Sequence, residues 1–176
     1  MGFDNVVVMI PFCRTPEEGD RVLATMKAAG LERGKGGLKV YVMVEIPANV
    51  IRAEEFAQRF DGFSIGSNDL TQLTLGVDRD SGRLASLFAE DDPAVLWMIR
   101  EAISRGHAAG VPVGLCGQAP SNDPKFARLL VEAGIDSISV TPDSFLQVKD
   151  NVAQAEAEAS GRPSAAGIVA RGEGGV

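Results

Sequence analysis

Short runs of apolar residues alternate along the chain with longer stretches in which apolar positions recur at helical spacing. The short runs are typical of β-strands, and the longer stretches are typical of amphipathic helices. This alternation predicts βα units that build a parallel sheet. About five strands are expected, at residues 6–10, 38–44, 62–66, 111–115 and 137–140.

Three of the intervening helices carry start and stop signals. Thr15-Pro16-Glu17-Glu18 combines an N-cap, a proline at the first helical position and a capping-box glutamate, and Gly30 stands where the helix should end. Two later helices are bounded in the same way, by Asp92-Pro93 with Gly110 and by Asp123-Pro124 with Gly134. Trp97, at helical spacing with its apolar neighbours, is expected to pack against the fold.

The length of 176 residues, 45% of them hydrophobic, suits one ordinary core and a single domain. After residue 155 the composition shifts to Ala, Gly, Ser and Glu. We therefore expect a domain at residues 1–155 and a disordered tail at residues 156–176.

The charge and hydropathy of the chain argue against some classes of binding partner. The formal net charge of −7 and the pI near 4.8 argue against nucleic acid or an anionic membrane surface, because both repel an acidic protein. No apolar run approaches the length of a membrane span, and no signal-peptide pattern is present, so a cytoplasmic location is expected. A small anionic substrate would need a bound metal or a positioned arginine.

Two acidic residues follow predicted strands, at the edge where ligands of parallel α/β folds gather. Glu45 follows the second strand and Asp69 follows the third. Two carboxylates at neighbouring strand ends suit Mg²⁺, which prefers oxygen ligands. Each also has a structural alternative: Glu45 could pair with a surface lysine, and Asp69 could cap a helix that begins at Leu70.

The third strand ends in Gly66-Ser67-Asn68-Asp69. The backbone amides of Gly66 and Ser67 could bind an anion, and Asn68 could donate to a carboxylate or enolate oxygen. A plain turn with an N-cap explains the same residues. The segment is neither a Walker loop nor a dinucleotide fingerprint, so no nucleotide site is assigned.

The two cysteines lie far apart without CxxC spacing, which supports neither a zinc site nor a disulfide. Cys13 is expected to be a small buried side chain. Cys116 ends a strand before a glycine, where a thiol could shuttle a proton or act as a nucleophile, although burial remains an alternative. His107 is the single histidine, and it is expected on a solvated helix surface. Its lack of company excludes a histidine-based metal cluster or triad.

Two arginines are the cations closest to the strand-end loops. Arg14 follows the first strand, and Arg79 lies in Val77-Asp78-Arg79-Asp80. That loop could fold over an anion, although a solvated surface arginine is the default expectation.

Four segments together resemble the phosphoenolpyruvate-utilising enzymes, and among them the pyruvate, water dikinase branch. They are residues 9–12 (MIPF), 43–47 (MVEIP), 63–72 (FSIGSNDLTQ) and 114–118 (GLCGQ). The resemblance runs from residue 5 to residue 146, and the third segment with its downstream Asp-Arg-Asp is highly specific.

This resemblance implies a TIM barrel that binds pyruvate or phosphoenolpyruvate through Mg²⁺. By resemblance, Cys116 would donate a proton to enolpyruvate and Arg79 would contact the phosphate. Glu45 and Asp69 would ligate the metal, and the substrate would be lined by Glu45, Gly66, Ser67, Asn68 and Asp69. The branch transfers a phosphoryl group from ATP to pyruvate through a phosphohistidine.

The resemblance is partial, because the chain has no room for the family's nucleotide-binding and phosphohistidine domains. We expect an α/β partial TIM barrel, about the last five βα units, that is not active alone. Its open sheet edges predict a homo-oligomer or association with the missing part. Two rivals are a Mg²⁺-dependent oxo-acid lyase and a non-catalytic subunit that completes a split enzyme.

Overall fold

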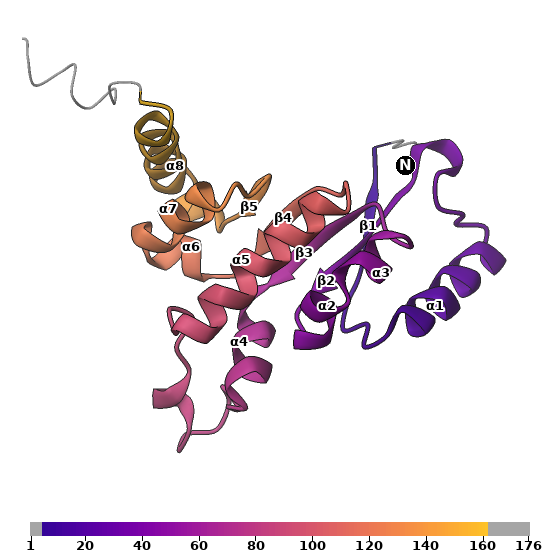
Figure 1. The fold of residues 1–176 in the computed structure, drawn as a ribbon, viewed down its shortest axis with the longest axis horizontal. Coiled ribbons are helices and arrows are strands. Elements are labelled where there is room, and N and C mark those ends of the chain that lie inside the picture. The colour runs from indigo at the N-terminus through magenta and orange to yellow at the C-terminus, as the bar shows by residue number, and fades with distance from the viewer. Residues whose placement is uncertain (1–4, 162–176) are drawn as a thin grey trace, which may run out of the picture.

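The computed structural model describes residues 5–161. It contains one sheet of five parallel strands in the order β1-β2-β3-β4-β5 (Figure 1). The strands are Val7–Ile10, Lys39–Val44, Gly62–Gly66, Val113–Cys116 and Ser137–Ser139. Each strand pairs with the next in sequence and the order never reverses, as in a barrel and unlike a doubly wound sheet. All five predicted strands are confirmed, within two residues at each end.

Helices connect the strands, and the three predicted helix starts are confirmed. The eight α-helices are Pro16–Ala28 (α1), Pro47–Ile51 (α2), Ala53–Ala57 (α3), Ser67–Leu75 (α4), Pro93–Ala108 (α5), Ala119–Asn122 (α6), Pro124–Glu132 (α7) and Phe145–Ala159 (α8). Side chains of Thr15, Asp92 and Asp123 each accept a hydrogen bond from a first-turn N–H. The expected capping box is shifted, because Glu18 accepts from the N–H of Arg14, at 2.7 Å, and not from that of Thr15.

Side-chain alternation gives the sheet two different faces. Val40, Val42 and Val44 of β2 are at most 1% exposed and belong to the core that α2, α3 and α5 cover (Figure 1). Tyr41 and Met43 point to the other face, as the period of two requires. Trp97 of α5 is 52% exposed, so its predicted role in packing is wrong.

The sheet has an open edge on each side. Among residues 5–161, β1 and β5 each pair with a single strand. Val7 and Met9 of β1 are 46% and 40% exposed. A groove of about 610 Å³ lies along β5, between α7 and α8, and Ile138 and Phe145 contribute to its lining.

Two aspartates clamp the amino-terminal edge of the sheet. Asp61 precedes β3 and accepts hydrogen bonds from the N–H of Val40 at 2.8 Å and from Arg33 Nε at 2.9 Å. Asp136 precedes β5 and accepts from the N–H of Val113 at 2.7 Å, while His107 Nε2 lies 2.8 Å from the same oxygen. We call these the amino-edge clamps.

His107 lies on the helix surface, as predicted, but its ring is also paired with Asp136. Its side chain is 39% exposed. The hydrogen bond from Val113 N–H, together with His107, lowers the pKa of Asp136 below its ordinary value.

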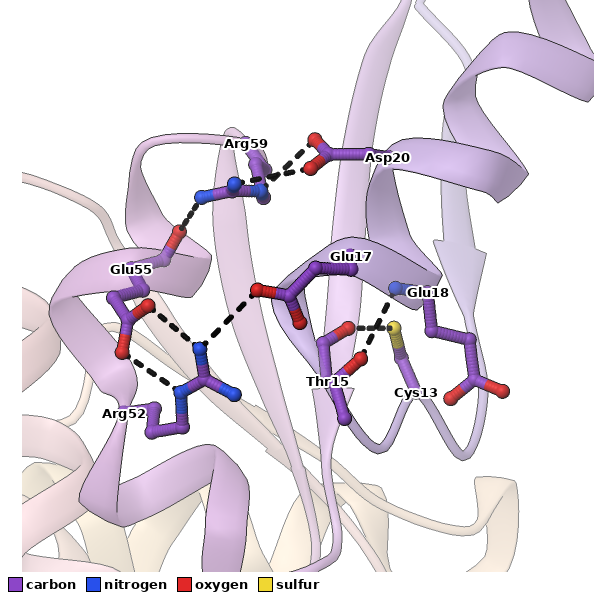
Figure 2. Close-up of polar contacts among 8 residues, drawn as sticks. All are labelled: Cys13, Thr15, Glu17, Glu18, Asp20, Arg52, Glu55 and Arg59. Carbon is purple, nitrogen blue, oxygen red and sulfur yellow. Dashed lines mark hydrogen bonds and ion pairs between the residues drawn. The ribbon is translucent and has the colours of Figure 1, made fainter.

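Ion pairs join α1 to the residues that flank α3, on the outside of the molecule (Figure 2). Arg59 donates to both carboxylate oxygens of Asp20, at 2.9 and 3.0 Å. Arg52 lies 2.7 Å from Glu55 and 3.5 Å from Glu17. Such exposed pairs contribute at most about 1 kcal/mol each, so they orient α1 more than they stabilise it.

The C-terminal helix α8 packs on α7 and runs to Ala159. It continues four residues beyond the domain boundary predicted at residue 155, because alanine and glutamate favour helix. Most of the predicted tail, residues 162–176, lies outside the described residues. Within residues 5–161, no helix is both long and apolar enough to cross a membrane.

Candidate functional site

Three neighbouring strand ends bring Glu45, Gly66 and Cys116 into one row. Gly66 pairs with Cys116 in the register between β3 and β4. On the other side, a Cβ at Gly66 would lie 2.8 Å from Oε2 of Glu45. A side chain at position 66 would therefore displace the Glu45 carboxylate, and glycine is what lets the two strand ends approach.

Glu45 is a buried acid without a cationic partner. It is 3% exposed, and none of the ion pairs among the described residues includes it. Burial raises the pKa of its carboxyl, the N–H of Phe12 opposes this, and the charge of Asp69 raises the pKa further. The alternative that Glu45 pairs with a surface lysine is thus not what the structure shows. A buried, unneutralised carboxylate is a feature of sites that bind cations.

The backbone of Phe12 is shaped to reach Glu45. Phe12 has a φ of +50°, which is uncommon for a residue with a side chain. Its N–H donates to Oε1 of Glu45 at 2.5 Å. The guanidinium of Arg14 lies 5.0 Å from the centre of the Phe12 ring and pairs with Glu18 at 3.5 Å, so Arg14 is engaged away from Glu45.

Asn49, which sequence reasoning missed, ties the first two strand ends together. Its Oδ1 accepts from the N–H groups of Glu45 and Ile46, at 3.3 and 3.0 Å. Its Nδ2 donates to the carbonyl of Cys13 at 2.7 Å. The side chain is fully buried, so these bonds fix the turn that carries Glu45.

Asp69 lies in the first turn of α4. The helix begins at Ser67, with Gly66 as an N-cap that offers no side-chain hydrogen bond. Asp69 is thus the third helical residue, and the alternative that it caps a helix starting at Leu70 is wrong. For the same reason Asn68 is helical and not part of a plain turn. The first-turn N–H groups have no intrahelical partners, and the start of a helix is in general suited to bind an anion.

The Ser67 hydroxyl is held from two sides. It is fully buried and donates to Oε1 of Glu90 at 2.6 Å. A Cβ at Gly117 would lie 2.1 Å from Oγ of Ser67, so the turn after β4 presses against the same group. Sequence reasoning missed Glu90, which lies 23 residues away in the segment before α5.

The two thiols have different surroundings. Cys116 is partly exposed at the end of β4, and the hydroxyl of Ser64 donates to its Sγ at 3.3 Å. Cys13 is 2% exposed and donates to the carbonyl of Thr15 at 3.4 Å (Figure 2). Burial raises the pKa of Cys13, which fits the inert role predicted for it.

Arg79 lies in the segment between α4 and α5, which projects beyond the carboxyl-terminal edge of the sheet (Figure 1). Its backbone N–H donates to the side chain of Gln72 at 3.2 Å. Its side chain is exposed, and no ion pair within residues 5–161 involves it. The structure therefore does not bring Arg79 into contact with Glu45 or Asp69.

Glu45 and Asp69 are suited to bind a magnesium ion whose remaining ligands are water or substrate oxygens. The described residues contain no cluster of three or more side chains able to hold a metal by themselves. Burial is the main cause of the raised pKa of Glu45, and the nearby charge of Asp69 adds to it. Mg²⁺ is commonly held by one or two carboxylates together with water and substrate oxygens.

Sequence comparison finds close relatives. A family model described as the PEP-binding domain of PEP-utilising enzymes matches residues 1–157. Phosphoenolpyruvate synthase of Synechocystis is 58% identical over 89% of this chain and 19% of its own length. That of Aquifex aeolicus is 56% identical over 89% of this chain and 18% of its own length. The chain thus spans about a fifth of these relatives.

Solved structures share the fold. RipC from Yersinia pestis matches with a TM-score of 0.60 at 11% identity, covering 92% of this chain and 66% of that one. An HpcH/Hpal aldolase/citrate lyase family protein from Burkholderia cenocepacia matches with a TM-score of 0.57 at 20% identity, covering 80% and 60%. At these identities the likeness concerns the fold alone, and it agrees with an α/β partial barrel.

Proposed function

Since the chain belongs to the PEP-utilising enzymes and matches their PEP-binding domain, we propose that the carboxyl-terminal edge of its sheet binds phosphoenolpyruvate or pyruvate together with Mg²⁺. The observation that carries this proposal is Glu45, buried at 3% exposure beside Asp69 without a cation of the protein. A divalent cation would remove the cost of burying that charge.

Glu45 and Asp69 would hold the ion, and a bound Mg²⁺ would stabilise the negative charge of an enolate oxygen. The substrate would lie against the start of α4, where the backbone N–H groups of Ser67, Asn68 and Asp69 would donate to its oxygens. Gly66 would leave room for it, and the amide of Asn68 would donate to a substrate oxygen. Glu45 also borders this space through its contact with Gly66.

Cys116 would move the proton of the methyl group. Its thiol lies at the end of β4 next to Gly66, with Ser64 donating to the sulfur. When the enolate of pyruvate is protonated, the S–H bond of Cys116 would break and a C–H bond would form at the methylene carbon, which leaves pyruvate and a thiolate. Arg79 would approach the phosphate once a ligand is bound.

The complete reaction belongs in this proposal to a longer enzyme. The relatives are named phosphoenolpyruvate synthase, and this chain corresponds to about a fifth of their length. Phosphoryl transfer from ATP through a phosphohistidine would use domains outside this chain, and the chain alone would not catalyse it. The alternative function, a Mg²⁺-dependent oxo-acid lyase, has no specific support, because the aldolase-family match shows the fold alone.

Association remains part of the proposal. The open edge of β1, with Val7 and Met9 exposed, and the groove along β5 are surfaces that a further polypeptide would cover. Either a second copy or the remainder of the enzyme fits this description, including the split-enzyme alternative. A cytoplasmic location stays with it as a prediction.

Calorimetric titration with oxalate, a mimic of the enolate, tests the site. We expect binding that requires Mg²⁺ and is lost in Asp69→Ala. Asp150→Ala, which removes an exposed acid from α8, serves as the matched control and should bind as the parent does. If a chain that unfolds cooperatively in urea binds no oxalate with Mg²⁺, then it does not contain an assembled site.

A further inference from the structure

The hydrogen bond between Ser67 and Glu90 joins the start of α4 to a segment that otherwise leaves the body of the molecule. Ser67 is fully buried, and its Oγ lies 2.6 Å from Oε1 of Glu90. A bond of this length to a carboxylate is charge-assisted and stronger than a neutral one. The Ser67 hydroxyl therefore donates its hydrogen bond to Glu90. The group of Ser67 that would donate to a ligand is its backbone N–H.

Glu90 lies near the end of the segment 76–92, which runs from α4 to α5 and carries Arg79. Side-chain hydrogen bonds of this segment, within the described residues, mostly stay inside it or reach α4 and the start of α5. The bond from Ser67 fastens the far end of the segment to the first residue of α4, directly after the end of β3. Figure 1 shows the rest of the segment projecting away from the sheet.

We propose that Glu90 is a positioning residue that fastens the segment 76–92 to the start of α4, beside the end of β3, and thereby helps Arg79 of this segment to reach the phosphate of a bound ligand. This rests on the proposed function. Glu90 touches Ser67 and not the reacting atoms, so it acts through the segment. Its loss should weaken ligands that carry a phosphate and should spare those that do not.

The chemistry of the two ligands separates this role from general damage to the site. Oxalate would bind at the metal and enolate positions of the proposed site and has no phosphate, whereas phosphoenolpyruvate carries one. We expect Glu90→Ala to weaken phosphoenolpyruvate about tenfold, the effect of losing one hydrogen bond to a charged group, and to change oxalate by less than about twofold. Glu90→Gln keeps an acceptor oxygen and should restore most of the affinity.

The experiment measures the dissociation constants of both ligands with Mg²⁺ by calorimetry, for the parent chain and for these variants. Asp91→Ala, which removes an exposed acid next to Glu90, is the matched control and should match the parent. Equal weakening of both ligands in Glu90→Ala, or no weakening of phosphoenolpyruvate, would overturn the proposal.

Hydrogen exchange tests the fastening without any ligand. Glu90→Ala should speed the exchange of amides in residues 76–92, and the double variant Ser67→Ala with Glu90→Ala should speed it no further, because one bond is lost in each case. Unchanged exchange in Glu90→Ala contradicts the proposal. If the parent binds neither ligand while exchange responds as expected, the proposed function fails and the fastening by Glu90 stands.

Discussion

The backbone N–H of Phe12 donates to Oε1 of Glu45 at 2.5 Å, so the end of β1 fixes a buried carboxylate that follows β2. This contact uses a left-handed backbone at Phe12, with a φ of +50°. Non-glycine residues in that region are held there by their surroundings, and they cluster at functional sites.

Glu45→Gln should change how stability depends on pH. The pKa of Glu45 is raised in the folded chain, so the folded state holds this proton more tightly than the unfolded state. The parent should therefore lose stability relative to Glu45→Gln as pH rises from the ordinary glutamate pKa through the raised one. Urea unfolding at a series of pH values measures this. Glu54→Gln, at an exposed position of α3, is the control, and parallel pH curves for parent and Glu45→Gln would contradict the expectation.

Asn49→Ala should lower the free energy of unfolding by about 2–4 kcal/mol. It leaves the N–H groups of Glu45 and Ile46 and the carbonyl of Cys13 without their partner in a buried turn. Urea unfolding measures the change. Asn151→Ala on α8 should stay within about 0.5 kcal/mol of the parent, and an equally small effect at position 49 would refute this account.

Gly66→Ala should weaken oxalate about tenfold while the chain still folds. The new Cβ would lie 2.8 Å from Oε2 and 3.0 Å from Cβ of Glu45, so the carboxylate must move, at a cost of about 1–3 kcal/mol. Calorimetry and urea unfolding report the two effects. Gly82→Ala, where a Cβ meets no atom within 4 Å, is the control for stability. Oxalate binding as tight as in the parent would show that Glu45 need not keep its place.

Asp136→Asn should weaken the amino-edge clamp that precedes β5. The pKa of Asp136 is lowered in the folded chain, so its contribution is present above the ordinary aspartate pKa and is lost as pH falls through the folded value. Because the site is half exposed, we expect a loss of about 0.5–1 kcal/mol at neutral pH. Urea unfolding at neutral and acidic pH checks this. Asp143→Asn, an exposed aspartate in the turn after β5, should not alter the profile.

Cys116 should react with iodoacetamide faster than Cys13. Cys116 is partly exposed, whereas Cys13 is 2% exposed and its pKa is raised by burial. Mass spectrometry of labelled peptides gives both rates. Oxalate with Mg²⁺ should slow labelling of Cys116, and equal rates at the two thiols would contradict the surroundings described for them.

Features that depend on near neighbours in sequence could be predicted. The caps at Thr15, Asp92 and Asp123 bond to amides two or three residues away, and all three were expected. The predicted order of the strands placed Glu45 and Asp69 after neighbouring strands, and the pairing of β2 with β3 agrees with this.

Features that depend on distant neighbours could not be predicted. Asn49 reaches Cys13 across 36 positions, and Glu90 meets Ser67 across 23. Neither residue type signals such a partner, since asparagine and glutamate are ordinary on exposed helices and loops. The prediction that Trp97 packs against the fold was wrong for a related reason, because helical spacing does not tell which face of α5 lies against the sheet.

The amino-edge clamps lie at the opposite end of the strands from Glu45, Ser67 and Cys116. Substitutions in the amino-edge clamps should therefore lower the melting temperature, and substitutions at the carboxyl edge should weaken ligand binding in titrations. A random library of this chain can be sorted first for folding and then for oxalate binding. Substitutions that prevent folding should then gather at the amino edge of the sheet, and those that prevent only binding should gather at the carboxyl edge. New ligand preferences could then be selected at the carboxyl edge in a scaffold that the amino edge keeps folded.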